Sequence, residues 1–331
     1  MVAFTQSSFL SQVRRLRSLA KVALTRFPVK VKKIQFINHG ENATFKIITK
    51  NNKSFLLRIQ RHDYHSLAAI NEELKWLEYL SKKTELKVPI PFRSKTEKLI
   101  ETVFTEAMGE ERHCCMFHWI EGTFVDKSLS LNQIEQLGQL VGQLQKNSLK
   151  LKTVHRRYWT SDGLLGPNPK FGRSDNLCGV HPQDQKTITR LRKKTLKKLK
   201  SFERKFPKRR GLIHADAHFK NVLWMKNRFG VIDFDDSGYG FWAYDVCIPL
   251  MVTKYLLRDR KQLHLYPKFE AAFFQGYKKF MTWDQHDQKF LAHITLARRL
   301  TMLGWLQSRS DNPRLRAHLK VAVKKVLKDY A

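Results

Sequence analysis

The sequence predicts an α+β protein of two lobes: a small lobe with an antiparallel sheet and one main helix, and a larger, mostly helical lobe. The first observation is a change of pattern, because residues 31–121 contain short strand-like segments whereas residues 122–331 show mainly helical periodicity. The second is length, since 331 residues suffice for two lobes with a core each. A basic helix is expected ahead of the lobes, in residues 1–30.

The small lobe is predicted from strands that follow one another closely. We expect them at residues 31–36, 44–48, 54–59, 99–105 and 113–119. Polar turns at 38–42 and 51–52 separate the first three, which predicts an antiparallel meander. A helix over residues 66–82 is predicted from an apolar stripe of Leu67, Ile70, Leu74 and Leu77. A rotation of about 100° per residue places Glu73 beside that stripe, so this carboxylate is expected to face the interior.

The larger lobe begins with a helical stripe after residue 131 and ends with several amphipathic helices in residues 244–331. Residues 161–179 have no sustained period, which favours a long loop or lid. The densest basic run, residues 186–210, contains thirteen Lys or Arg and one Glu, and its apolar spacing predicts a helix with a solvated basic face.

The charge balance favours contact with anions, because 62 basic side chains against 29 acidic ones give a formal charge of +33. Nucleotides, phosphorylated metabolites, nucleic acid and acidic membrane surfaces all fit such a field. The alternative is a lysine-rich composition with only nonspecific contact to polyanions, since the basic residues are spread along the whole chain.

The cysteines indicate a reducing compartment, and the cytoplasm fits best. The four cysteines show no CxxC pair and no regular spacing, which predicts neither a disulfide framework nor a zinc site. No apolar run is long enough for membrane insertion.

The N-terminal segment allows two interpretations. Before Glu41 the chain has no acidic residue, as in an organelle transit peptide, but a first helix over residues 9–27 packed on the small lobe is the favoured interpretation.

The chemistry is expected in residues 212–221, a loop that places Asp216 five residues before Asn221. Two short apolar strands and a polar turn at residues 226–228 follow, and then a second acidic loop, residues 231–238. If that turn centres on Asn227, the hairpin sets Asn221 opposite Asp233.

An amide and a carboxylate brought together in this way suit phosphoryl transfer. A hard cation must be held against phosphate oxygens by oxygen ligands, so Asn221 and Asp233 are predicted to bind Mg²⁺. Asp216 would accept the proton of the acceptor hydroxyl and orient it. Asp235 is a candidate second metal ligand, or it is merely solvated, and His214 is expected to cap the loop by hydrogen bonds.

The segment from Leu212 to Asp245, with Gly238-Tyr239-Gly240, resembles the aminoglycoside phosphotransferase and choline kinase superfamily, particularly its homoserine-kinase-like and stress-response-kinase-like branch. Upstream, residues 40–44 resemble its nucleotide-covering loop, residues 57–59 its third strand, residues 73–77 its first-lobe helix and residues 117–122 its hinge. The resemblance implies a bilobal, protein-kinase-like fold, with ATP as co-substrate and Mg²⁺ as metal.

Residue by residue, the resemblance implies Asp216 as the catalytic base and Asn221 and Asp233 as metal ligands. For the nucleotide it implies contacts from Gly40, Asn42, Arg58, Glu73 and the backbone of Met116, Phe117 and Trp119. Arg58 stands where most of the superfamily has lysine, and it would neutralise phosphates and pair with Glu73 through a planar fork rather than a point charge. The glycine usual between His214 and Asp216 is Ala215 in this chain.

The sequence therefore predicts a kinase that phosphorylates a hydroxyl of a small molecule. One alternative is a protein Ser/Thr kinase of the stress-response type, and another is an inactive kinase-like module that binds polyanions. Residues 244–331 contain seventeen Lys or Arg against seven acids. A polycationic aminoglycoside would be repelled there, so antibiotic phosphorylation is not expected to be the physiological activity.

Overall fold

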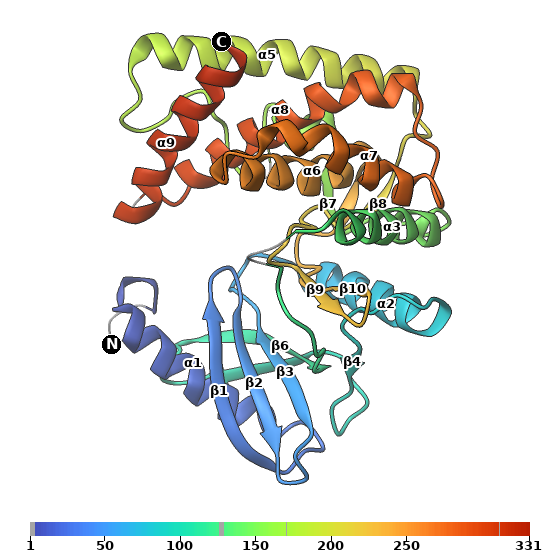
Figure 1. Cartoon of the computed structure of the whole chain (residues 1–331). Helices are drawn as coiled ribbons and strands as arrows, with labels where there is room; N and C mark the ends of the chain where they lie inside the picture. Colours follow the sequence, from blue (N-terminus) through green and yellow to red (C-terminus); the bar gives the residue numbers. More distant parts are fainter. Residues whose placement is uncertain (1–3, 126–128, 170, 311) are drawn as a thin grey trace. The chain divides into compact units, whose positions relative to one another are not determined.

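The computed structural model describes residues 4–125, 129–169, 171–310 and 312–331. The chain divides into two compact units, the first made of residues 1–122 and 230–235 and the second of residues 123–229 and 236–331. Strands dominate the first unit and helices the second (Figure 1), which gives the α+β fold that the sequence predicts. The segment 230–235 belongs to the first unit although it lies far along the chain.

The first unit contains an antiparallel sheet in the order β1-β2-β3-β6-β4, with β5 pairing β6. Its elements are η1 (Phe4–Gln6), α1 (Phe9–Leu24), β1 (Val31–His39), β2 (Ala43–Thr49), β3 (Ser54–Ile59), α2 (Leu67–Lys83), β4 (Pro91–Phe92), β5 (Glu101–Thr105) and β6 (Glu110–His118). β2 pairs antiparallel with β1 and β3, so the predicted meander is confirmed.

The two faces of β3 have different roles. Phe55, Leu57 and Ile59 lie in the core cluster that also contains the buried leucines and alanines of α1. Because side chains alternate along a strand, Arg58 belongs to the opposite face. The predicted first helix therefore packs on the sheet, and Arg58 lies on the side of β3 that faces away from this core cluster.

The second unit is mostly helical. Its elements are α3 (Leu131–Ser148), β7 (Arg157–Trp159), α4 (Ser161–Leu165), α5 (Pro182–Lys205), β8 (Arg210–Ile213), β9 (Val222–Met225), β11 (Gly238–Phe241), α6 (Trp242–Asp259), η2 (Leu263–Leu265), α7 (Tyr266–Tyr277), α8 (Gln285–Gln307) and α9 (Pro313–Tyr330). The predicted loop over residues 161–179 is wrong at its start, because α4 occupies five of those residues. Residue 170 lies outside the described residues.

A small sheet in the order β7-β11-β8 lies within this helical unit. β11 runs parallel to β7 and antiparallel to β8. A Cβ on Gly238 would lie 2.2 Å from the carbonyl oxygen of Arg157, and one on Gly240 would lie 2.5 Å from Cβ of Trp159. Glycine at these two positions therefore lets β11 approach β7 closely, and it fixes where Trp159 lies.

The hairpin after the catalytic loop differs from the expected one. β9 pairs with β10 (Arg228–Val231), and Arg228 thus belongs to a strand rather than to the turn. Lys226 and Asn227 alone join the strands, both with positive φ (37° and 69°), as in a two-residue type I′ turn. The register argument from a turn centred on Asn227 is therefore wrong by one residue, and pairing of Asn221 with Asp233 no longer follows from it.

In the part of the chain that the structure describes, every helix is too short or too polar to cross a lipid bilayer.

Candidate active site

The loop of residues 212–221 is anchored by Asp245, in the first turn of α6. Its two carboxylate oxygens accept hydrogen bonds from the backbone N–H groups of His214 (2.9 Å) and Ala215 (2.6 Å). Asp245 is fully buried, and burial raises its pKa to about 6 although the two backbone hydrogen bonds lower it. The helix start therefore holds the backbone just before Asp216.

Ala215 adopts a left-handed backbone conformation with φ of 66°. A Cβ is disfavoured in that region, and glycine adopts it at little cost. The absence of the usual glycine is thus a source of local strain, and the hydrogen bond to Asp245 helps to hold the residue there. His214 is fully buried, and its Nδ1 accepts a hydrogen bond from the backbone N–H of Asp216 (3.2 Å), which is the loop-capping contact expected of it.

Asp216 is surrounded by donors. Arg298 Nη2 lies 2.7 Å from Oδ1, while Asn221 Nδ2 at 2.9 Å and His218 Nε2 at 3.3 Å lie near Oδ2. Burial alone would raise the pKa of Asp216, but the hydrogen bond from His218 and the charge of Arg298 outweigh it and hold this pKa below its usual range. Asp216 is therefore ionised at neutral pH, with its side chain still 21% exposed.

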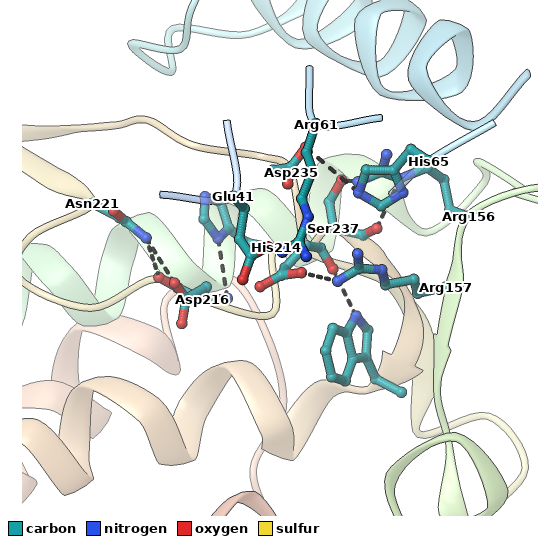
Figure 2. A network of polar contacts seen from close by, with 12 residues as sticks. Glu41, Arg61, His65, Arg156, Arg157, His214, Asp216, Asn221, Asp235 and Ser237 are labelled. Carbon is teal, nitrogen blue, oxygen red and sulfur yellow. Dashed lines mark hydrogen bonds and ion pairs between the residues drawn. The ribbon is translucent and has the colours of Figure 1, made fainter. Parts of the chain in front are cut away.

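Asn221 has one defined orientation, with its amide pointing at Asp216 (Figure 2). Nδ2 donates to the backbone oxygen of Asp216 (3.0 Å) as well as to its carboxylate. Both hydrogen bonds use the nitrogen, so the carbonyl oxygen Oδ1 is turned elsewhere. An amide oxygen is a ligand that Mg²⁺ or Ca²⁺ accepts, so Asn221 fits a hard-cation site by its chemistry.

In the first unit, Arg58 and Glu73 form a buried, bidentate ion pair with distances of 2.7 and 3.0 Å. Burial lowers the pKa of Arg58, but the charge of Glu73 outweighs it and the net shift is upward. With its amide oxygen facing Arg58, Gln60 accepts from Nε and Nη2 (2.9 Å each) and donates to Asn42 Oδ1 (2.8 Å). The pairing that the sequence predicts is present, and Gln60, which sequence reasoning missed, connects it to the expected nucleotide-covering loop.

The acidic segment of the first unit is held by packing on both sides of Asp233. Val231 donates its backbone N–H to Lys87 O (2.9 Å), and the Phe234 ring lies edge-on to Trp76, with centroids 5.0 Å apart. Asp233 itself has a φ of 64°. Asp235 is buried, and its Oδ1 lies 3.5 Å from Nε2 of the buried His65 (Figure 2). A carboxylate such as that of Asp233 is a suitable ligand for a cation that also binds phosphates.

The residues expected to contact adenine lie at the end of β6 and just beyond. Met116 and Phe117 are buried, and the Arg58 guanidinium lies 5.1 Å from the Phe117 ring centroid. Trp119 is half-buried, with Lys46 Nζ 4.1 Å from its ring. Gly40 is exposed, and its N–H donates to Asn42 O (3.1 Å). The Phe117 side chain thus lies on the face of the sheet that carries Arg58, whereas Met116 belongs to the core cluster on the other face.

Two residues of the second unit were not identified as site residues from the sequence. Asp245 appears there only as part of the family-like segment, and Arg298 only as one cation in a basic helical region. Both contact the catalytic loop across 30 or more residues. No pattern in the sequence distinguishes Arg298, because its burial is visible only in the structure.

Comparison with known proteins shows which family this chain resembles. Residues 33–285 match the phosphotransferase enzyme family. Amicoumacin kinase of Bacillus subtilis (strain 168) is 25% identical over 236 residues, which span 69% of this chain and 65% of that protein, slightly less than two thirds of its length.

Solved structures show the same fold. A microcompartment-associated aminopropanol kinase is 26% identical with a TM-score of 0.80, and the match covers 94% of each chain. The amicoumacin kinase hAmiN, in complex with AMP-PNP, Ca²⁺ and Ami, is 19% identical with a TM-score of 0.77, covering 98% of this chain and 97% of that one. The bilobal, kinase-like fold class is therefore confirmed, as is the resemblance on which it was predicted.

Proposed function

Because this chain belongs to the phosphotransferase enzyme family, we propose that it is a kinase that transfers the γ-phosphoryl group of ATP, with Mg²⁺, to a hydroxyl of a small molecule. The observation that carries the proposal is the state of Asp216: an ionised carboxylate, fixed by Arg298, Asn221 and His218, on a loop anchored by Asp245. Family membership alone would be compatible with an inactive descendant, whereas this arrangement keeps a base and its orienting groups.

Asp216 is proposed to accept a hydrogen bond from the acceptor hydroxyl and to take its proton as the O–P bond forms. In phosphoryl transfer the transition state is loose, so catalysis depends mainly on position and charge. The low pKa of Asp216 suits a group that orients the hydroxyl throughout and receives the proton late. ADP leaves, and the proton on Asp216 is released to solvent.

Asn221 and Asp233 are proposed to hold the divalent ion, which when bound supplies positive charge to the phosphate oxygens. Asn221 would contribute Oδ1, the atom that its two hydrogen bonds to Asp216 leave over. Asp235, buried beside His65, is the proposed second acidic ligand. Arg58, Gly40 and Asn42 are proposed to bind the phosphates, with Glu73 holding Arg58 in place. The backbone of Met116, Phe117 and Trp119 is proposed to bind the adenine.

The acceptor is proposed to be small, because two relatives carry names that state small-molecule acceptors, amicoumacin and aminopropanol. Neither compound is assigned to this chain. The cationic character of residues 244–331, with seventeen Lys or Arg against seven acids, favours an acceptor that is not a polycation.

The test is a screen of a metabolite pool with the full chain, Mg²⁺ and γ-labelled ATP, beside Asp216→Ala and Asp233→Asn. We expect label to enter a small molecule with wild type and with neither variant. Asp259→Asn, an exposed carboxylate at the end of α6, is the control and should remain active. Label found instead in acid-precipitated protein would indicate a protein kinase, and equal labelling by wild type and Asp216→Ala would refute the proposal.

A further inference from the structure

Arg298, on α8, is the contact between the helical region and the proposed catalytic base. Its Nη2 donates to Asp216 Oδ1 (2.7 Å) and its Nη1 to the Tyr244 hydroxyl oxygen (2.9 Å). The guanidinium carbon lies 5.5 Å from the Tyr244 ring centroid. Only 8% of the Arg298 side chain is exposed, so the cation is held inside the second unit and is not a mobile surface charge.

The aromatic groups beside Arg298 leave it little freedom to move. Tyr244 is fully buried and stacks on Trp159, with ring centroids 5.4 Å apart and planes 19° from parallel. Trp159 in turn donates its Nε1–H to Asp236 O (2.7 Å). Stacked rings with a bonded polar atom form a rigid support. Tyr244 therefore restricts the movement of Arg298, and Arg298 in turn holds the Asp216 carboxylate in place.

The two oxygens of Asp216 are not equivalent. Oδ2 is approached by two donors, Asn221 Nδ2 and His218 Nε2, and a carboxylate oxygen has about two lone-pair positions. In the described part of the chain, Oδ1 accepts its hydrogen bond from Arg298. One lone-pair position of Oδ1 therefore remains for an incoming hydroxyl, and it lies beside the guanidinium.

Stability alone does not account for this arginine. Burying a cation is costly, and a buried ion pair is on balance weak evidence for stabilisation. Among the described residues, the buried Nε–H of Arg298 has no hydrogen-bond partner, which adds to the cost. A well-packed apolar side chain at this place would avoid both costs, so a role at Asp216 is the better explanation.

We propose that Arg298 is a positioning residue that fixes the Asp216 carboxylate so that Oδ1 receives the acceptor hydroxyl. This inference rests on the proposed kinase function. The acceptor oxygen would then lie next to the guanidinium, where positive charge favours the negative charge that spreads over the transferring group. The helical region would contribute directly to the geometry of the base, and not only to the shape of the acceptor pocket.

The test measures Mg²⁺-dependent ADP release by the full chain, with water as the acceptor, in Arg298→Met, Arg298→Lys and Tyr244→Phe. Arg298→Met should lower kcat on the order of 10–100-fold while KM for ATP changes less than about 2-fold, because the lost interaction acts on the base and not on nucleotide binding. Arg298→Lys should recover part of that loss. Tyr244→Phe, which leaves Asp216 untouched, should lower kcat several-fold.

Arg299→Met is the matched control. Arg299 is the next residue of α8, equally buried, and pairs with Asp329 at 2.7 Å. It should lose comparable stability but keep kcat within about 2-fold of wild type. If Arg298→Met does not fold, Arg298→Lys and Tyr244→Phe decide the question.

The outcomes separate the two proposals. Wild type no faster than Asp216→Ala would overturn the kinase proposal and this inference with it. An active wild type with an unchanged kcat in Arg298→Met, or in both Arg298→Lys and Tyr244→Phe, would overturn the role of Arg298 alone. A kcat loss of the same size in Arg299→Met would also overturn it, since the effect would then be structural.

Discussion

Asp245 and Ala215 lie 30 positions apart, yet Asp245 Oδ1 accepts the backbone N–H of Ala215 at 2.6 Å. The bond spans from the first turn of α6 to the residue before Asp216. It holds Ala215 in a left-handed conformation that an alanine disfavours. The position of Asp216 thus depends on a buried carboxylate that hydrogen-bonds to the backbone of the two residues before it.

The strained alanine gives a first prediction. Ala215→Gly should raise the free energy of unfolding by about 0.5–1 kcal/mol, because relief of left-handed strain exceeds the added entropy of the unfolded chain. Ala217→Gly is the control, since Ala217 is equally buried but is not among the positive-φ residues, and it should be destabilising. Urea denaturation measures both, and a destabilised Ala215→Gly would show that the strain argument is wrong.

The raised pKa of Asp245 gives a second prediction. Its pKa is about 6 in the folded protein against 3.8 as the reference, so between these pH values the folded state binds more protons than the unfolded state. The contribution of Asp245 to the free energy of unfolding is therefore largest below about pH 4. It decreases as the pH rises to about 6, by a total on the order of 3 kcal/mol.

Asp245→Asn isolates that effect, because an amide does not titrate in this range. The stability of wild type minus that of Asp245→Asn should fall between pH 4 and 6 and stay level from pH 6.5 to 8. Urea midpoints at a series of pH values measure the difference. Parallel curves for the two proteins would contradict a raised pKa at this residue.

Local pattern was sufficient for much of the fold. The meander and α2 follow from strand alternation and helical spacing over a few residues, and the same spacing correctly placed Glu73 inside. α4 was missed because five residues are too few for a period to appear. The hairpin register failed because a polar Arg228 looks like a turn residue, although two positive-φ residues close the turn without it.

The supports of the catalytic loop were beyond such reasoning. Arg298 and Asp216 are 82 residues apart, and no periodicity within α8 relates one to the other. The side chain of Arg298 is recognisable as unusual only once its burial is known, because a cation in a basic region is ordinarily a solvated one. The spacing of residues in the sequence was thus enough to predict Asp216 and Asn221. The groups that orient them, such as Arg298, became apparent only from the tertiary structure.

The Arg58–Glu73 pair gives a third prediction, which concerns stability without nucleotide. Glu73→Gln should lower the free energy of unfolding on the order of 3 kcal/mol, because it removes the carboxylate that is ion-paired with the buried guanidinium. Glu41→Gln is the control. Glu41 pairs with Arg61, whose side chain is 51% exposed, at a similar distance of 2.8 Å.

Loss of that exposed pair should change stability by less than about 1 kcal/mol, since solvent screens it. Denaturation of both variants in nucleotide-free buffer makes the comparison. Equal losses of stability in the two variants would mean that burial does not increase the contribution of the Arg58–Glu73 pair to the free energy of unfolding.

The fourth prediction concerns Asn221, whose Nδ2 donates twice to Asp216. Asn221→Asp removes both donors and sets a second carboxylate against the first, so the loop should lose its orientation and ADP release should fall on the order of 100-fold. Asn227→Asp makes the same chemical change at an exposed turn residue with φ of 69°, a conformation that aspartate tolerates, and it should keep wild-type activity. Both variants are assayed for Mg²⁺-dependent ADP release over a range of metal concentrations.

If Asn221→Asp were as active as Asn227→Asp at every metal concentration, the Asn221 amide would be neither an orienting donor nor a required metal ligand. The assignment of residues 212–221 as the catalytic loop would then have to be abandoned.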